Sequence, residues 1–154
     1  MKDPAISVKD ILVGLGYTFG QQSDWSIYIG QWPDSPNRAI LINTVGGLSP
    51  EPNLLLNYPS VQILTRGKPS DYIAASDTIQ TIVAKLLGMS SVTVNSDVYR
   101  GCVQLGDVAY LGQDENARPM LVSNFRFYVE PAYTLSLHDA LPIRSEERRV
   151  GKEC

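Results

Sequence analysis

The segment from Ser70 to Leu87 constrains the fold most, because it carries the clearest helix pattern in the chain. Ser70 can cap its first turn, and Asp71 is favoured at the positive end of the helix dipole. Gly88 is expected to end it. The apolar residues at helical spacing form one stripe: Tyr72, Ala75, Ile79, Ile82, Val83 and Leu86. A helix with a single apolar stripe must bury that stripe against another layer of structure.

Alternating patterns on both sides of this helix predict the strands of the other layer. In the predicted strand over residues 120–129, one face carries Leu121, Phe125, Phe127 and Val129, and the other carries Asn124, Arg126 and Tyr128. The same reading predicts further strands over residues 25–32, 39–45, 60–66 and 98–105. The last of these has an alternative end at Leu111, and residues 112–119 form a polar hairpin connection.

A shorter helix is predicted near the start of the chain. Asp3 is suited to the N-cap position and Pro4 to the first helical position, whereas Gly14 and Gly16 are expected to end the helix. Further on, residues 46–59 contain three prolines and read as a long irregular loop.

The predicted order is therefore α-β-β-β-α-β-β. This order gives an α+β domain of two layers, with a mostly antiparallel or mixed sheet of about five strands and two helices on one face. Residues 1–133 are predicted to form this single domain, which suits a chain of 154 residues.

Residues 134–154 do not belong to that pattern. The strings TLSLHDALPI (134–143) and RSEERRVGKEC (144–154) back-translate, with suitable codons, into DNA sequences that are reverse complements of each other. The pair resembles a common sequencing adapter read once in each direction. We interpret residues 134–154 as a non-native tail, disordered or a stray helix, and exclude them from fold reasoning. The alternative is an ordinary charged helix, and the native C-terminal residues are expected to be missing.

Excluding the tail removes most of the chemistry that a catalytic site would need. The only histidine, His138, lies there, and so does Cys154, the one possible disulfide partner of Cys102. Cys102 itself falls within a strand pattern and reads as a buried, inert thiol. Residues 114–116 resemble the start of a calcium loop but lack its glycine and distal glutamate, so a hairpin turn is the better interpretation. We predict no catalytic residue, no metal site, no cofactor and no enzymatic activity.

The charge of the chain bears on its partners. The net charge is −3, and removing the four cations and four acids of the tail leaves residues 1–133 at the same value. An acidic balance argues against a binder of nucleic-acid phosphates and against a basic membrane-surface helix. Arg66 and Lys68 are too few for a nucleic-acid patch. The chain has no apolar run long enough to span a membrane and no signal peptide is expected.

Exposed apolar side chains are the remaining candidates for function. Leu54, Leu55 and Leu56 lie in the proline-bounded loop, and Trp32 borders the turn PDSP. Such groups often mark protein contacts, and we assign them, with Arg66, to a candidate protein interface. The alternative is that the loop folds back over the sheet and covers the core.

Four segments in a fixed order carry a resemblance to a known family. They are GLG (14–16), IGQWPDSPNRAILINTVGG (29–47), YPSVQILTRGKPSDYIAASD (58–77) and GDVAYLGQDENARPMLVSNFRFYVE (106–130). Together they resemble the phage minor capsid or tail terminator family over nearly all of residues 1–133.

The resemblance implies a structural protein of a tailed phage or prophage, made in the host bacterial cytoplasm and placed at the head–tail junction of the virion. Its implied partners are further copies of itself in a ring, commonly a hexamer, the tail tube protein and a head-completion or connector protein. DNA is expected to pass through the ring without specific binding, because negative walls repel phosphate. Two alternatives stay open: a head-completion or connector subunit, and a small α+β domain that binds a ligand between sheet and loop.

Overall fold

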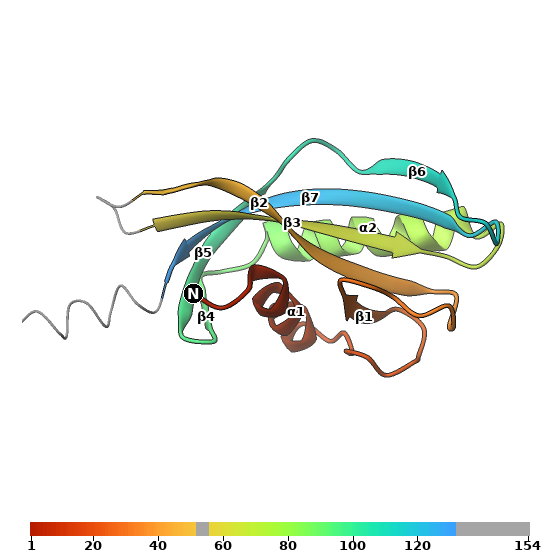
Figure 1. Ribbon diagram of the computed structural model, residues 1–154, viewed down its shortest axis with the longest axis horizontal. Coiled ribbons are helices and arrows are strands. Elements are labelled where there is room, and N and C mark those ends of the chain that lie inside the picture. Colours follow the sequence, from red (N-terminus) through yellow and green to blue (C-terminus); the bar gives the residue numbers. More distant parts are fainter. Residues whose placement is uncertain (52–55, 132–154) are drawn as a thin grey trace, which may run out of the picture.

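The computed structural model describes residues 1–51 and 56–131, which form two helices and one curled mixed sheet (Figure 1). This confirms the predicted α+β class, but the described residues contain seven strands instead of about five. In chain order the elements are α1 (Pro4–Gly14), β1 (Ser26–Ile29), β2 (Ala39–Glu51), β3 (Leu56–Arg66), α2 (Tyr72–Leu87), β4 (Val92–Val94), β5 (Asp97–Gln104), β6 (Ala109–Gln113) and β7 (Pro119–Glu130).

β7 occupies the middle of the sheet. The strand order is β1-β2-β3-β7-β5-β4, and β6 pairs with β7 outside this path. β1 and β2 are parallel, whereas the other pairs are antiparallel. Because β3 occupies one edge of β7, β5 and β6 follow each other along the opposite edge. Between them the backbone N–H of Leu105 still donates to the carbonyl of Asn124, 2.8 Å away.

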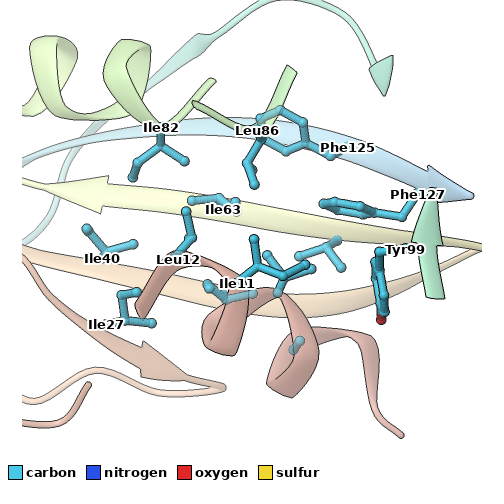
Figure 2. Packing of buried hydrophobic residues seen from close by; sticks show 14 of the residues in the cluster. Ile11, Leu12, Ile27, Ile40, Ile63, Ile82, Leu86, Tyr99, Phe125 and Phe127 are labelled. Atoms are coloured by element: carbon cyan, nitrogen blue, oxygen red, sulfur yellow. The ribbon is translucent and has the colours of Figure 1, made fainter. Parts of the chain in front are cut away.

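Both helices pack on the same face of the sheet and share its core. Side chains of α1 and α2 join the inward residues of β2, β3 and β7 in one hydrophobic cluster (Figure 2). Its largest fully buried members are Leu12, Ile27, Ile40, Ile42, Ile63, Ile82, Leu86, Tyr99, Phe125 and Phe127. Burial of each large apolar side chain contributes about 1.5–3 kcal/mol, so this cluster is the main source of stability.

The caps of the two helices differ in how well the sequence predicted them. Asp3 caps α1 as expected, since its carboxylate accepts the backbone N–H of Ala5 at 3.0 Å. In α2 the N-cap position belongs to Asp71, so the prediction of Ser70 was wrong. Ser70 has a φ of +63°, and the Asp71 carboxylate makes no cap bond but accepts a hydrogen bond from Arg38 Nε at 2.9 Å. Tyr72 is exposed, but the other predicted stripe residues are buried.

The predicted loop over residues 46–59 is the largest difference between the sequence-based expectation and the structure. Its described residues, 46–51 and 56–59, continue β2 and β3 as a hairpin with irregular register. Pro50 lies within the register shift between Leu48 and Glu51, and Pro59 pairs with Gly47 at the end of the shift that begins at Thr44. The short strand β4 was not predicted, and β6 is a separate strand, not the end of β5.

Candidate functional site

Arg66 lies at the end of β3, where it holds the loop between β1 and β2. Its side chain is 2% exposed. Nε donates to the carbonyl of Asn37 at 2.9 Å, and Nη2 donates to the carbonyls of Pro33 at 2.7 Å and Pro36 at 2.9 Å. Burial lowers the pKa of this guanidinium from its ordinary value, and the nearby charge of Arg118 lowers it further. A buried charge is tolerated when its hydrogen bonds are satisfied, and here three backbone carbonyls supply them.

Arg118 holds the same loop from the hairpin between β6 and β7. Its Nη1 donates to the backbone carbonyl of Asp34 at 2.6 Å, and its Nη2 donates to the Asp34 carboxylate at 3.0 Å. On the other side Nε donates to the carboxylate of Asp114 at 2.8 Å. Two buried arginines from different elements therefore fix residues 33–37, which we call the clamped loop.

Asp114 organises the hairpin that presents Arg118. Its carboxylate accepts the backbone N–H groups of Asn116 at 2.9 Å and Arg118 at 3.0 Å. Burial acts to raise the pKa of this carboxyl, but the hydrogen bonds and the charge of Arg118 outweigh it and hold the pKa below its ordinary value of 3.8. The carboxylate is used within the turn, which confirms the hairpin interpretation of residues 112–119.

The predicted interface residues fall in different environments. Trp32 is half-buried, and its ring stacks on the guanidinium of Arg66, so the structure brings these two together beside the clamped loop. Leu56 is half-buried at the start of β3, where it pairs with Glu51 of β2. Leu54 and Leu55 lie outside the described residues. Arg66 is buried, so any contribution that it makes to an interface acts through the loop it holds.

Cys102 lies on the inner face of β5, packed against the main hydrophobic cluster. Its thiol is half-buried and lies 3.4 Å from the carbonyl of Leu86, to which it donates. Burial raises the pKa of Cys102 to about 11, so the thiol stays protonated near neutral pH and is a poor nucleophile. In residues 1–51 and 56–131 no group of three His, Cys, Asp or Glu side chains is placed to hold a metal ion.

Several large apolar side chains that the sequence did not single out are exposed in the described residues, and two groups of them lie at strand edges. Ile73 is 75% exposed in the first turn of α2, and the preceding Tyr72 packs edge-to-face on Tyr110 of β6, with ring centroids 5.2 Å apart. At the other place Val45 and Leu48 of β2 are exposed. Helical periodicity wrongly placed Tyr72 in the core, whereas Ile73 lies outside the predicted apolar stripe.

The fold and these surfaces define a small α+β domain that presents a clamped loop, strand edges and exposed apolar side chains. Residues 12–131 match the family model described as bacteriophage tail terminator protein. Because this match covers most of the chain, the protein belongs to the bacteriophage tail terminator family, a family of phage structural proteins, and it is a component of the virion. A search of curated proteins gives no match. No helix in the described part of the chain is long and apolar enough to cross a membrane.

Proposed function

We propose that this chain is a tail terminator subunit that assembles head-to-tail into a ring, with six copies as the expected number. The ring caps the tail tube, stops its polymerisation and gives the surface on which the head docks at the head–tail junction. The observation that carries this proposal is the family match over residues 12–131. Further copies of the chain, the tail tube protein and a head-completion or connector protein are its partners.

The surface charge supports passage of DNA without specific binding. Exposed acids outnumber exposed cations in the described residues. The exposed acids are Asp3, Asp24, Asp34, Glu51, Asp77, Asp107 and Glu115, and the exposed cations are Lys2, Lys68 and Arg100. Negative surface repels phosphate. The protein should therefore not retain duplex DNA in a gel-shift assay near physiological salt, and tight binding that weakens steeply with salt would contradict this part of the proposal.

The experiment that tests the proposal combines mass measurement with electron microscopy. The full chain is mixed with purified tail tubes, and the expected result is discrete rings in native mass spectrometry and one additional disc at a single end of each tube. A protein that stays monomeric and never associates with tubes would contradict the proposal. Capsid genes upstream and a tail-tube gene downstream would support it independently.

The two alternatives predict different results in the same experiment. A head-completion or connector subunit would bind the head vertex and leave the tube end bare. A ligand-binding domain would remain a monomer or dimer in the presence of tubes. The ligand-binding alternative places its ligand between the sheet and a long loop. The described residues of that predicted loop, 46–51 and 56–59, are strand instead, which disfavours this alternative.

A further inference from the structure

The outer edges of the sheet differ in whether another segment of the chain covers them. The edge of β1 is covered, because residues 18–20 run beside it: the N–H of Ile27 donates to the carbonyl of Thr18 at 2.8 Å, and Phe19 forms a parallel bridge with Ile27. The short strand β4 lies against α1, and Asn95 in the turn after it donates to the carboxylate of Asp10 at 2.9 Å. Natural proteins commonly cover sheet edges in these ways, because unpaired backbone groups invite pairing with other chains.

Other strand edges have no such cover in the described residues. One is residues 100–104 of β5, which extend past the pairing with β4 and carry the charged Arg100. Two more belong to β6 and β2. β6 pairs only with β7, so its second edge, here called the β6 edge, is open. β1 pairs with β2 only as far as Ile42, so residues 43–51 of β2 keep one open edge, here called the β2 edge. The start of the chain lies beside this stretch without pairing with it as a strand. The Thr44 hydroxyl accepts the N–H of Ala5 at 3.2 Å and donates to the Asp3 carboxylate, and Met1 and Pro4 line a hollow with Leu48. No backbone hydrogen bond from another described segment reaches either edge.

Exposed large apolar side chains gather at both open edges. Tyr110 and Leu111 belong to β6, and the contact between Tyr110 and Tyr72 brings the first turn of α2, with Ile73, beside that strand. On the β2 edge Val45 and Leu48 are 47% and 55% exposed. An edge that combines unused backbone groups with apolar side chains has the composition of a protein contact.

The two edges cannot pair within one copy of the chain. β7 and β3 lie between β6 and β2, which separates the edges by three strand spacings, or about 14 Å. The edges also face away from each other across the sheet. In Figure 1, β6 lies toward one end of the long strands and the free end of β2 lies toward the other.

We propose that the β6 edge of one copy pairs with the β2 edge of the next copy, so that the sheet continues from subunit to subunit. This inference rests on the proposed ring and names the surfaces that build it. A second copy of the chain can supply a pairing strand for both edges, because each copy has one β6 edge and one β2 edge. Pairing of two different edges is a heterologous contact, and a heterologous contact repeated by a rotation that closes builds a ring.

The test uses two full-length variants, each with one edge disabled by charge, and a matched control. The β2-edge variant carries Val45→Lys and Leu48→Lys, and the β6-edge variant carries Ile73→Lys and Leu111→Lys. The control carries Val13→Lys and Leu87→Lys, which alter side chains of comparable exposure away from both edges. All substituted positions are exposed, so circular dichroism should show that each variant stays folded.

Native mass spectrometry then separates the outcomes. The wild-type chain and the control should form rings, and each edge variant alone should remain a monomer of about 17.0 kDa. An equimolar mixture of the two edge variants should give a heterodimer of twice that mass, because one intact interface remains between them. Rings from either edge variant alone, or a mixture that stays monomeric, would overturn the edge pairing while leaving the ring intact. A wild-type chain that forms no ring, even on tail tubes, would overturn the proposed function and the pairing together.

Amide hydrogen exchange tests whether the contact is made by the backbone. In the assembled wild-type protein the exchange of residues 43–51 and 109–113 should slow by at least about tenfold relative to the monomeric β2-edge variant. Unchanged exchange at both edges in a protein that forms rings would show that the subunits meet elsewhere.

Discussion

Cζ of Arg66 lies 4.6 Å from the centroid of the Trp32 ring. Trp32 directly precedes the clamped loop, whereas Arg66 ends β3, and the same guanidinium that lies over the indole also donates to three carbonyls of that loop. The aromatic ring contacts the guanidinium from one side, and the backbone carbonyls accept its hydrogen bonds from another. The loop between β1 and β2 is therefore part of the rigid scaffold, and its exposed residues are presented in a fixed arrangement.

Replacement of Arg66 should be costly to the fold. In Arg66→Met the three carbonyls lose their donors while the surrounding structure stays closed, so we expect the free energy of unfolding to fall by about 3 kcal/mol. Arg100→Met removes an exposed pair with Glu130 and should cost less than about 1 kcal/mol. Urea unfolding of both variants measures the difference, and equal losses would contradict a structural role for Arg66.

The Asp114 hairpin should make stability depend on acid pH. The folded pKa of this carboxyl lies below its ordinary value of 3.8, so its stabilisation is present above the unfolded pKa and disappears as the pH falls through the folded value. The wild-type chain should have a higher urea midpoint than Asp114→Asn near neutral pH, and the gap should narrow as the pH falls below 3.8. The exposed Asp107 provides the control, since Asp107→Asn should show a smaller gap. A gap between wild type and Asp114→Asn that is independent of pH would argue against an ionised carboxylate in the turn.

Gly47 should not accept a side chain. Its φ is +132°, and an added Cβ would lie 2.2 Å from the backbone carbonyl oxygen of Tyr58. Gly47→Ala must therefore shift the hairpin of β2 and β3, and we expect a loss of about 3 kcal/mol. Gly101→Ala is the control, because a Cβ there meets nothing within 4 Å and the backbone is not left-handed. The thermal midpoint of each variant measures the loss. An equal fall in midpoint for Gly47→Ala and Gly101→Ala would contradict the steric argument.

Leu54 and Leu55 remain a predicted contact. If they belong to an interface, Leu54→Ser together with Leu55→Ser should impair ring assembly while the monomer keeps its unfolding midpoint, because polar replacement of contact residues weakens association without opening the core. Native mass spectrometry and urea unfolding are the two readouts. A monomer that unfolds would instead mean that these leucines cover the core, and the interface assignment would then be wrong.

A chain shortened after Tyr133 should be as stable as the full chain. The family match ends at residue 131 and does not include residues 134–154, which we interpret as translated adapter. The two proteins should have the same thermal midpoint within error, as expected when a removed segment adds no packing to the domain. A midpoint that drops by several degrees would contradict that interpretation.

Local signals predicted the parts of the fold that depend on nearby residues. The cap at Asp3, most of the α2 stripe and the alternation along β7 each involve neighbours within a few positions, and the structure confirms them. The strand structure of residues 46–51 and 56–59 was missed, because glycines and prolines normally mark loops. Here some of these residues lie at register shifts of the ladder, and periodicity does not reveal such shifts.

The contacts that hold the clamped loop were not predicted from the sequence. Arg118 and Asp34 are 84 positions apart, and a polar hairpin with one arginine looks like any solvated turn. Arg66 was placed among the interface residues, but nothing in its neighbourhood indicated that it would be buried under the loop. Long-range partners of this kind are chosen by the tertiary fold, so a single sequence carries no signal for them.

The central position of β7 sets a limit on when this domain can form during synthesis. β3, β5 and β6 all hydrogen-bond to β7, and β7 is the last strand of the described chain. Until residues 119–130 leave the ribosome, the hairpin of β2 and β3 and the strands β5 and β6 have no common partner. Long-range strand pairing is slow to form, so the nascent chain carries open strands until translation of the domain is complete. The order in which the strands are made thus delays folding, and with it the formation of the β6 and β2 edges, until residues 119–130 have been synthesised.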